Sequence, residues 1–353
     1  MTRARTLLDA DGRLAGVDLA RGLAVLGMLT AHLATTEELR WGDPGTWSGI
    51  VDGRSSILFA LLAGVSIALL SGGRSAVDGD RLRIVRGRLA VRALVLWVLG
   101  AALILTGVPV FVILPAYALL FLLAVPLLQW RPLALWALAG ATALIMPLLQ
   151  PGIDEVVALA GPDVELVLGW HYPFTVWISF VAAGMAVGRS RLTALRTQLV
   201  LLVGGIGAAA VGYGAAAWGS AAGVAREGWA AAVWSAAPHS VGIPEVIGSG
   251  GFAVAVLGAS LLVCRTFVRW VAFPIRAVGS MPLTAYVGQL VAWAIVASLV
   301  LGDTGDLGGF RALDPLGPFV WTTLALCTAW ALLWGRGPLE RVTAWAAAVV
   351  VRP

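Results

Sequence analysis

The stretch LAGVDLARGLAVLGMLTAHLAT, residues 14–35, has the apolar length of a helix that crosses a membrane. It nevertheless carries three ionisable side chains, Asp18, Arg21 and His32. At about 100° per residue, the three fall within an arc of about 60° on one face of the helix. Ionisable groups at membrane depth are costly, so they usually face a protein interior or a wet cavity. We therefore expect this face to line a polar path through an otherwise apolar protein.

The composition of the whole chain is typical of a polytopic membrane protein. Of its 353 residues, 59% are hydrophobic and only 12% are charged, which lies far outside the range of soluble domains. The apolar runs are long and continuous instead of alternating, so they indicate helices and not the strands of a membrane β-barrel. We predict an all-α transmembrane helix bundle whose surroundings are a lipid bilayer.

Ten spans account for the apolar runs, and the basic tail after residue 334 would supply an eleventh if it entered the membrane. The segment 221–245 is too polar at its ends for a span, and we expect it to be re-entrant or interfacial. Residues 1–353 are expected to form a single integral-membrane domain. The predicted spans cover about residues 14–35, 54–70, 89–105, 110–128, 133–149, 173–187, 198–218, 247–263, 282–301 and 317–334.

The charge distribution orients these spans. With ten spans and a cytoplasmic N-terminus, all but four of the arginines fall on the cytoplasmic side, as the positive-inside rule requires. Of the 19 acidic residues, 13 fall on the opposite side. Both termini are therefore predicted to be cytoplasmic, in a multi-pass protein of the cell inner (plasma) membrane. The arginines are scattered over short loops, so the net charge of +5 does not indicate nucleic-acid binding. The four outer arginines are Arg40, Arg54, Arg226 and Arg311.

The three histidines, His32, His171 and His239, all fall near the outer membrane face in this topology. Each could be an interfacial side chain that water satisfies. Alternatively, they share a pocket in which one serves as general base, a role that the near-neutral pKa of imidazole suits. We favour a catalytic role for His239 or His32 over His171.

Other polar residues are expected at the same pocket. Asp52 opens the second span, where it could pair with the first span or orient a histidine. Ser55 follows it on a polar stripe, although small residues also serve helix packing in membranes. The predicted substrate-binding residues on the outer side and in the ninth span are Arg54, Ser55, His171, Ser240, Glu245, Tyr286 and Gln289.

At the cytoplasmic end, Asp18 and Arg21 are spaced to neutralise each other. The alternative is that both belong to a substrate site, where Arg21, together with Arg88, Arg92 or Arg276, binds an anionic group such as a phosphate that enters from the cytoplasm. Walker, dinucleotide-binding, HExxH and GxSxG patterns are absent from the sequence, and no metal motif is present. Soluble-enzyme chemistries and a metal centre are therefore not predicted.

The first span also carries a recognisable pattern. Residues 13–22 read RLAGVDLARG, an R-x-x-x-(V/L)-D-x-x-R-G arrangement. Together with VDGRSSILFALLAGVSIAL (51–69), APHSVGIPEVIGSGGFAVAV (237–256), VGSMPLTAYVGQ (278–289) and RGPLE (336–340), it resembles bacterial membrane proteins related to heparan-α-glucosaminide N-acetyltransferase and the allied YeiB-like family.

That resemblance implies a transmembrane acyltransferase that takes acetyl-CoA, or another acyl-CoA, from the cytoplasm as its co-substrate. It assigns pattern positions to Asp18, Arg21 and Asp52. The animal enzyme's essential histidine lies in the loop after the first family helix, and here residues 36–51 contain no histidine. His32 or His239 would have to take that role.

We predict transfer of an acyl group to an extracytoplasmic hydroxyl or amine on a glycan, a lipid or a small molecule. A transporter or permease for a small molecule and a non-catalytic membrane scaffold are the alternatives. The sequence leaves open whether two copies of the chain form a homodimer.

Overall fold

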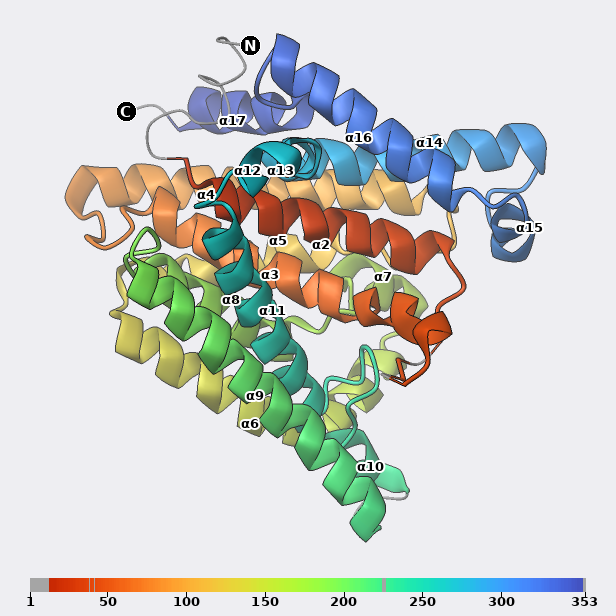
Figure 1. Cartoon of the computed structure of the whole chain (residues 1–353), viewed down its shortest axis with the longest axis horizontal. Helices are drawn as coiled ribbons and strands as arrows, with labels where there is room; N and C mark the ends of the chain where they lie inside the picture. Colours follow the sequence, from red (N-terminus) through yellow and green to blue (C-terminus); the bar gives the residue numbers. More distant parts are fainter. Residues whose placement is uncertain (1–12, 38, 41, 224–226, 352–353) are drawn as a thin grey trace.

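The computed structural model describes residues 13–37, 39–40, 42–223 and 227–351, and all regular structure within these residues is helical. Figure 1 shows a bundle in which many helices run in roughly one direction, while the pair α9 and α11 crosses them obliquely. The prediction of an all-helical protein is confirmed for the described residues.

Eight segments of the described chain are long and apolar enough to cross a membrane. Each lies on one of the predicted spans. They are α2 (Ala15–Leu33), α3 (Arg54–Leu70) with the preceding η1 (Pro44–Val51), α4 (Gly79–Ile104), α6 (Pro132–Leu159), α9 (Leu195–Ala222), α11 (Ile243–Val263), α14 (Pro282–Val300) and α16 (Leu316–Leu333).

The two remaining predicted spans, the fourth and the sixth, are shorter helices. α5 (Leu114–Ala124) has 11 residues and α8 (Phe174–Gly188) has 15, and at about 1.5 Å per residue neither reaches across a hydrocarbon layer of about 30 Å. α5 starts with proline in its first turn, and the chain before it, 108–113, is not helical. Both helices are largely buried in the protein, where they need not match the thickness of the bilayer.

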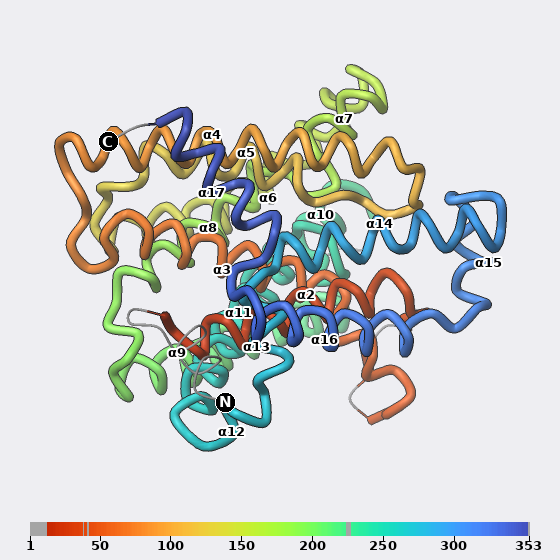
Figure 2. The backbone as a smooth tube through the Cα atoms, turned by 90° about the horizontal axis from the view of Figure 1, so that it is seen from above, coloured from red at the N-terminus to blue at the C-terminus, as the bar shows by residue number. Residues whose placement is uncertain are grey.

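The remaining elements are short. Among the described residues between α9 and α11, the expected interfacial segment forms the short helix α10 (Gly228–Val233). The C-terminal tail forms the amphipathic helix α17 (Pro338–Val350). Figure 2 shows α17 crossing over α4. The others are η2 (Pro126–Gln129), α7 (Pro162–Leu168), α12 (Val268–Val271), α13 (Phe273–Ser280) and α15 (Leu307–Ala312).

Helix α2 occupies the centre of the fold. In its most apolar stretch 67% of the residues are buried, compared with 11% in α16 at the periphery. Helix α2 packs against α3, α11 and α13. Glycines allow these close approaches: a methyl group at Gly22 would overlap the carbonyl oxygen of Ile275, and one at Gly279 would overlap that of Asp18. Small residues at such contacts are typical of membrane helices.

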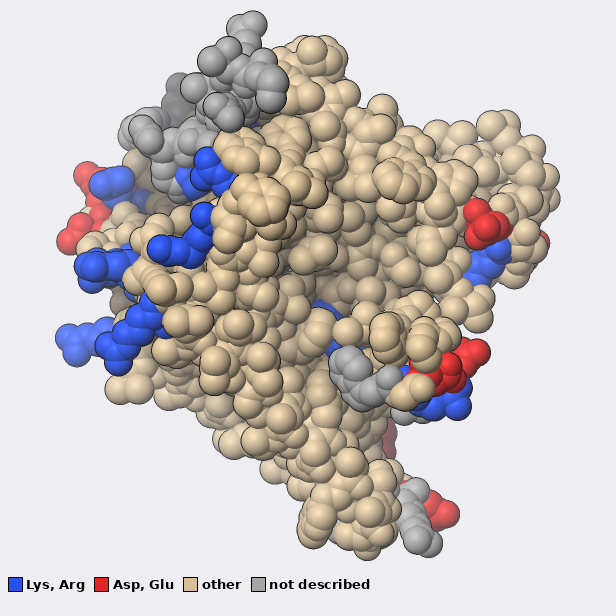
Figure 3. Space-filling view, viewed as in Figure 1, with Lys and Arg blue, Asp and Glu red and all other residues tan. Residues whose placement is uncertain are grey.

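Charged side chains gather at the ends of this bundle. Figure 3 shows arginines clustered at one end of the helices and most of the visible acidic side chains away from that end. The arginine-rich end holds the chain between α3 and α4 and the start of α4.

Candidate functional site

Three histidines that are far apart in the sequence line one cavity of about 200 Å³, which we call the histidine cavity. His32 comes from the last turn of α2, and His171 and His239 from the chain just before α8 and α11. Asp52, which joins η1 to α3, lies in the same wall. Each segment delivers its polar residue at a helix end, so the cavity sits near one end of the bundle. Other lining residues include Met28, Ser55, Ser56, Phe111, Tyr172 and Arg311.

Within this cavity, His239 faces both Asp52 and His171. Its Nε2 lies 3.8 Å from Asp52 Oδ1, and the ring centroids of His239 and His171 are 4.7 Å apart. His171 in turn stacks on Phe111 at 3.8 Å. Because Nδ1 of His239 is buried without a hydrogen-bond partner among the described residues, Nε2 is the nitrogen that an incoming molecule can reach.

The backbone around His239 is held by Glu245 in the first turn of α11. Oε1 accepts a hydrogen bond of 2.6 Å from the His239 N–H, and Oε2 accepts one of 2.6 Å from the Val241 N–H. The Ser240 hydroxyl donates to Oε2 at 3.2 Å. His239 and Val241 have φ angles of 62° and 51°, a left-handed conformation that side-chain-bearing residues seldom adopt. The carboxylate therefore stabilises a strained loop that aims the imidazole.

Burial keeps two of the histidines uncharged. It lowers the pKa of His239 to about 4. The pKa of His171 is also lowered to about 4, mainly by burial and further by His239, while Asp52 acts in the opposite direction. Both imidazoles are neutral at pH 7, the form in which a histidine accepts a proton.

Arg311 lines the histidine cavity but was not among the predicted site residues. Its guanidinium donates to the backbone carbonyl of His32 through Nε at 3.3 Å and Nη2 at 3.0 Å, and so caps the C-terminal end of α2. Arg311 is one of the few arginines on the predicted outer side, and that exception to the charge rule was the signal that could have marked it. Phe111 and Tyr172 carried no comparable signal.

A second cavity of about 760 Å³ lies at the other end of α2, and we call it the arginine cavity. Its polar lining consists mainly of Arg13, Asp18, Arg21, Arg92, Arg336 and Glu340, and Tyr286 belongs to the same wall. Arg13 and Arg21 lie at the N-terminal end of α2, Arg92 lies in the middle of α4, and Arg336 lies just before α17, which packs against α4.

Asp18 and Arg21 form an ion pair within this cavity. Asp18 accepts from Arg13 Nε at 2.6 Å and from Arg21 Nη1 at 3.1 Å, and Arg21 also donates to the Gly279 carbonyl and the Ser66 hydroxyl. Arg92 and Arg336 line the same space, and none of the ion pairs among the described residues includes either of them. Their guanidinium groups are therefore better placed than that of Arg21 to receive an anion.

Several predicted residues lie outside the lining of both cavities. Arg54 donates to the Tyr213 hydroxyl at 2.7 Å and to the Gly49 carbonyl, so its side chain joins helices. Ser240 and Glu245 shape the His239 loop instead of lining the space. Gln289 is buried, and no hydrogen-bond partner for its amide is found among the described residues.

The linings of the two cavities are one helical turn apart on α3 and two turns apart on α2, where they are separated by the residues between Arg21 and Met28. On α3, Ser56 lines the histidine cavity and Phe59 lines the arginine cavity, and Phe111 and Leu114 divide in the same way at the start of α5. Three residues of helix cover only about 4.5 Å. No group of three or more potential metal ligands was found within the described part of the chain.

Comparison with known families gives two matches. The family model described as "Heparan-alpha-glucosaminide N-acetyltransferase, catalytic" matches residues 13–205. A second, described as "Protein of unknown function (DUF418)", matches residues 188–349. Neither the curated proteins nor the solved structures gave a match.

The fold and the family matches together define the class: a multi-pass, acyltransferase-like membrane protein. Since the first match covers more than half of the 353 residues, the chain belongs to the heparan-alpha-glucosaminide N-acetyltransferase catalytic family. The resemblance carried by the first span is thereby confirmed.

Proposed function

We propose that this protein is a membrane-embedded acyltransferase of the plasma membrane. An acyl-CoA, such as acetyl-CoA, would bind from the cytoplasm in the arginine cavity. An extracytoplasmic amine or hydroxyl, for example on a glycan, would bind in the histidine cavity. The matched family is named for acetyl transfer to a glucosaminide, and the acceptor of this chain belongs to that broad chemical class.

One observation carries the proposal. Two cavities of opposite chemistry, one basic and one lined by histidines, lie at the two ends of α2, and on α3 their lining residues Ser56 and Phe59 are only three positions apart. Arginine suits the phosphates of a CoA thioester. A neutral imidazole suits deprotonation of an amine or hydroxyl.

The residues then take definite roles in the transfer. Nε2 of His239 removes the proton from the acceptor while the acceptor's nitrogen or oxygen attacks the thioester carbonyl. The new bond between the acyl carbon and the acceptor forms, and the bond to sulfur breaks. The CoA thiolate then takes up the proton that His239 accepted, which restores the neutral imidazole, so the products are the acylated acceptor and CoA thiol. Asp52, 3.8 Å away, stabilises the imidazolium formed in this step.

His32 is the second candidate for the base, because it lines the same cavity. An activity assay distinguishes the roles of His32 and His239. The protein in nanodiscs is incubated with acetyl-CoA and glucosamine, and free thiol and N-acetylglucosamine are measured. We expect His239→Ala to lower the rate by about 10²–10⁴-fold, the usual contribution of a general base, and Asp52→Asn to lower it less. A larger loss in His32→Ala than in His239→Ala would transfer the role to His32. Failure of the wild type to acylate glucosamine or a panel of amine and hydroxyl acceptors would overturn the proposal.

The donor site has its own test. Arg92→Gln and Arg336→Gln should each weaken acetyl-CoA binding about tenfold, which corresponds to about 1.4 kcal/mol for one charge-assisted contact. Arg83→Gln is the matched control, because Arg83 is also on α4 but is exposed and pairs with Asp80. Equal affinity in all four proteins would contradict the assignment of the arginine cavity to the donor.

A further inference from the structure

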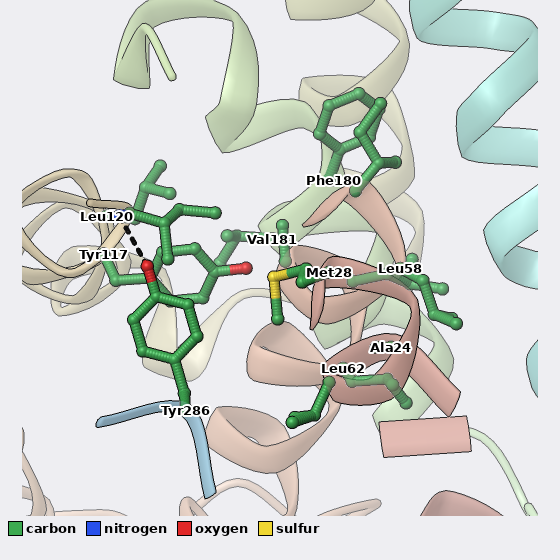
Figure 4. Close-up of a cluster of buried hydrophobic side chains, with 14 of the residues drawn as sticks. Ala24, Met28, Leu58, Leu62, Tyr117, Leu120, Phe180, Val181 and Tyr286 are labelled. Atoms are coloured by element: carbon green, nitrogen blue, oxygen red, sulfur yellow. Dashed lines mark hydrogen bonds between the residues drawn. The ribbon is translucent and has the colours of Figure 1, made fainter. Parts of the chain in front are cut away.

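Three side chains from three helices stand where the linings of the two cavities face each other. Met28 of α2 faces the histidine cavity, and Phe59 and Tyr117 face the arginine cavity. The rings of Phe59 and Tyr117 pack with centroids 5.3 Å apart. Figure 4 shows the hydroxyl of Tyr117 pointing toward the side chain of Met28. We call these three residues the septum.

A single hydrogen bond joins the septum across the layer. The Tyr117 hydroxyl donates to the backbone carbonyl of Ser56 at 3.3 Å, and Ser56 belongs to the histidine cavity. Nearby, the Tyr286 hydroxyl accepts from the Ile113 N–H, which fixes the chain that enters α5. Tyr117 is thus anchored at its tip by one long bond to a carbonyl of α3.

Met28 is the component most able to move. It is 4% exposed and packs in the core, but its unbranched side chain has three rotatable bonds and adapts to irregular spaces. A change of the Met28 rotamer moves the thioether without any change in the backbone of α2. Met28 thus lines the histidine cavity with a side chain that can change its shape without moving α2.

We infer that Met28, backed by Tyr117 and Phe59, sets the maximum length of the acyl chain that this protein transfers. The inference rests on the proposed function, since it concerns the same reaction: the thioester carbon leaves sulfur and bonds to the acceptor, and CoA leaves as the thiol. A short acyl group fits past the septum, and a longer chain is blocked by the thioether.

The test compares acetyl-, butyryl-, hexanoyl- and octanoyl-CoA as donors, with glucosamine as acceptor, for protein in nanodiscs. Met28→Ala widens the septum, and we expect the ratio of kcat/KM for hexanoyl-CoA to that for acetyl-CoA to rise at least tenfold. Met28→Phe narrows the septum, and the same ratio should fall below the wild-type value. Using two variants of opposite direction keeps the test valid if one of them does not fold.

Met185→Ala is the matched control, because Met185 is fully buried in α8 and lines neither cavity. Its ratio should equal that of the wild type. If folded Met28 variants transfer acetyl groups normally and keep the wild-type ratio of kcat/KM for hexanoyl-CoA to that for acetyl-CoA, the role given to the septum is wrong. The proposed function would then remain intact. Absence of transfer from every donor by every protein, including the wild type, would overturn the proposed function and the inference with it.

Discussion

At the scale of single residues, the low pKa of His239 makes a prediction about pH. Burial holds this pKa at about 4, so the imidazole remains neutral until the pH falls well below 6.5. In the wild type, kcat/KM should therefore fall on the acid side with a midpoint near pH 4. The His171→Gln variant should show an acid-side fall in the same pH range. A midpoint at pH 6.5 in the wild type would exclude His239 as a buried base.

The same shifts link stability to pH. Between pH 6.5 and 4 the unfolded chain binds protons at His239 and His171 that the folded chain does not bind. The free energy of unfolding should therefore fall as the pH drops through this window and be fully restored above it.

Glu245 gives a second prediction at this scale. Glu245→Gln keeps the size of the side chain but replaces one acceptor oxygen by a donor that faces a backbone N–H. A buried group left unsatisfied costs about 1–3 kcal/mol, so the thermal transition should shift downward and activity should drop without weaker acetyl-CoA binding. Glu155→Gln, at an exposed position of α6, is the control that should change neither. Equal transitions in both variants would contradict the role given to Glu245.

How far the sequence foretold these residues depends on what positions them. Each histidine was placed at one membrane face by topology alone, and all three do share one cavity. The hydrogen bonds from the His239 loop to Glu245 were not predicted. They depend on a left-handed backbone at His239 and Val241, and the hydropathy of a sequence does not reveal such a conformation at residues other than glycine. Glu245 was accordingly predicted to contact the substrate, whereas both of its carboxylate oxygens accept hydrogen bonds from the backbone of the His239 loop.

At the scale of helices, the contact between α2 and α13 predicts opposite effects for two glycine substitutions. Gly22→Ala places a methyl group against the Ile275 carbonyl, and overpacking of this type typically costs about 1–3 kcal/mol. Gly288→Ala, on α14, meets nothing within 4 Å and should gain up to about 1 kcal/mol of helix propensity. Thermal unfolding in detergent measures both. A Gly22→Ala protein as stable as Gly288→Ala would show that α2 and α13 are not closely packed.

Helix lengths were the least predictable property at this scale. Residues 110–113 are as apolar as a helix, so hydropathy included them in the fourth span, but the structure starts α5 only at Leu114. Hydropathy measures the apolar character of a segment and not its path. In place of a helix, the non-helical residues Pro109, Val110 and Phe111 line the histidine cavity.

At the scale of the whole molecule, the orientation of the bundle remains a prediction of the charge rule. In a background without Cys264 and Cys327, we introduce Ser75→Cys at the arginine-rich end and Asp163→Cys at the start of α7, both at exposed positions. On intact cells, a membrane-impermeant maleimide should label Asp163→Cys and not Ser75→Cys, and after lysis it should label both. The reverse pattern would invert the topology and place the arginine cavity outside the cell.

The septum between the cavities also bears on the membrane potential. Where water fills a cavity from either side, it carries the potential of that side inward, so most of the voltage drop falls across the layer between the cavities, where Met28 of α2 and Tyr117 of α5 lie. A unit charge crossing there gains or loses about 2.3 kcal/mol per 100 mV. A neutral acyl group crosses without that term, whereas a proton or a thiolate does not. In the proposed transfer, the proton that passes from the acceptor to the CoA thiolate is therefore the charge on which the membrane potential acts, whereas the acyl group itself moves independently of it.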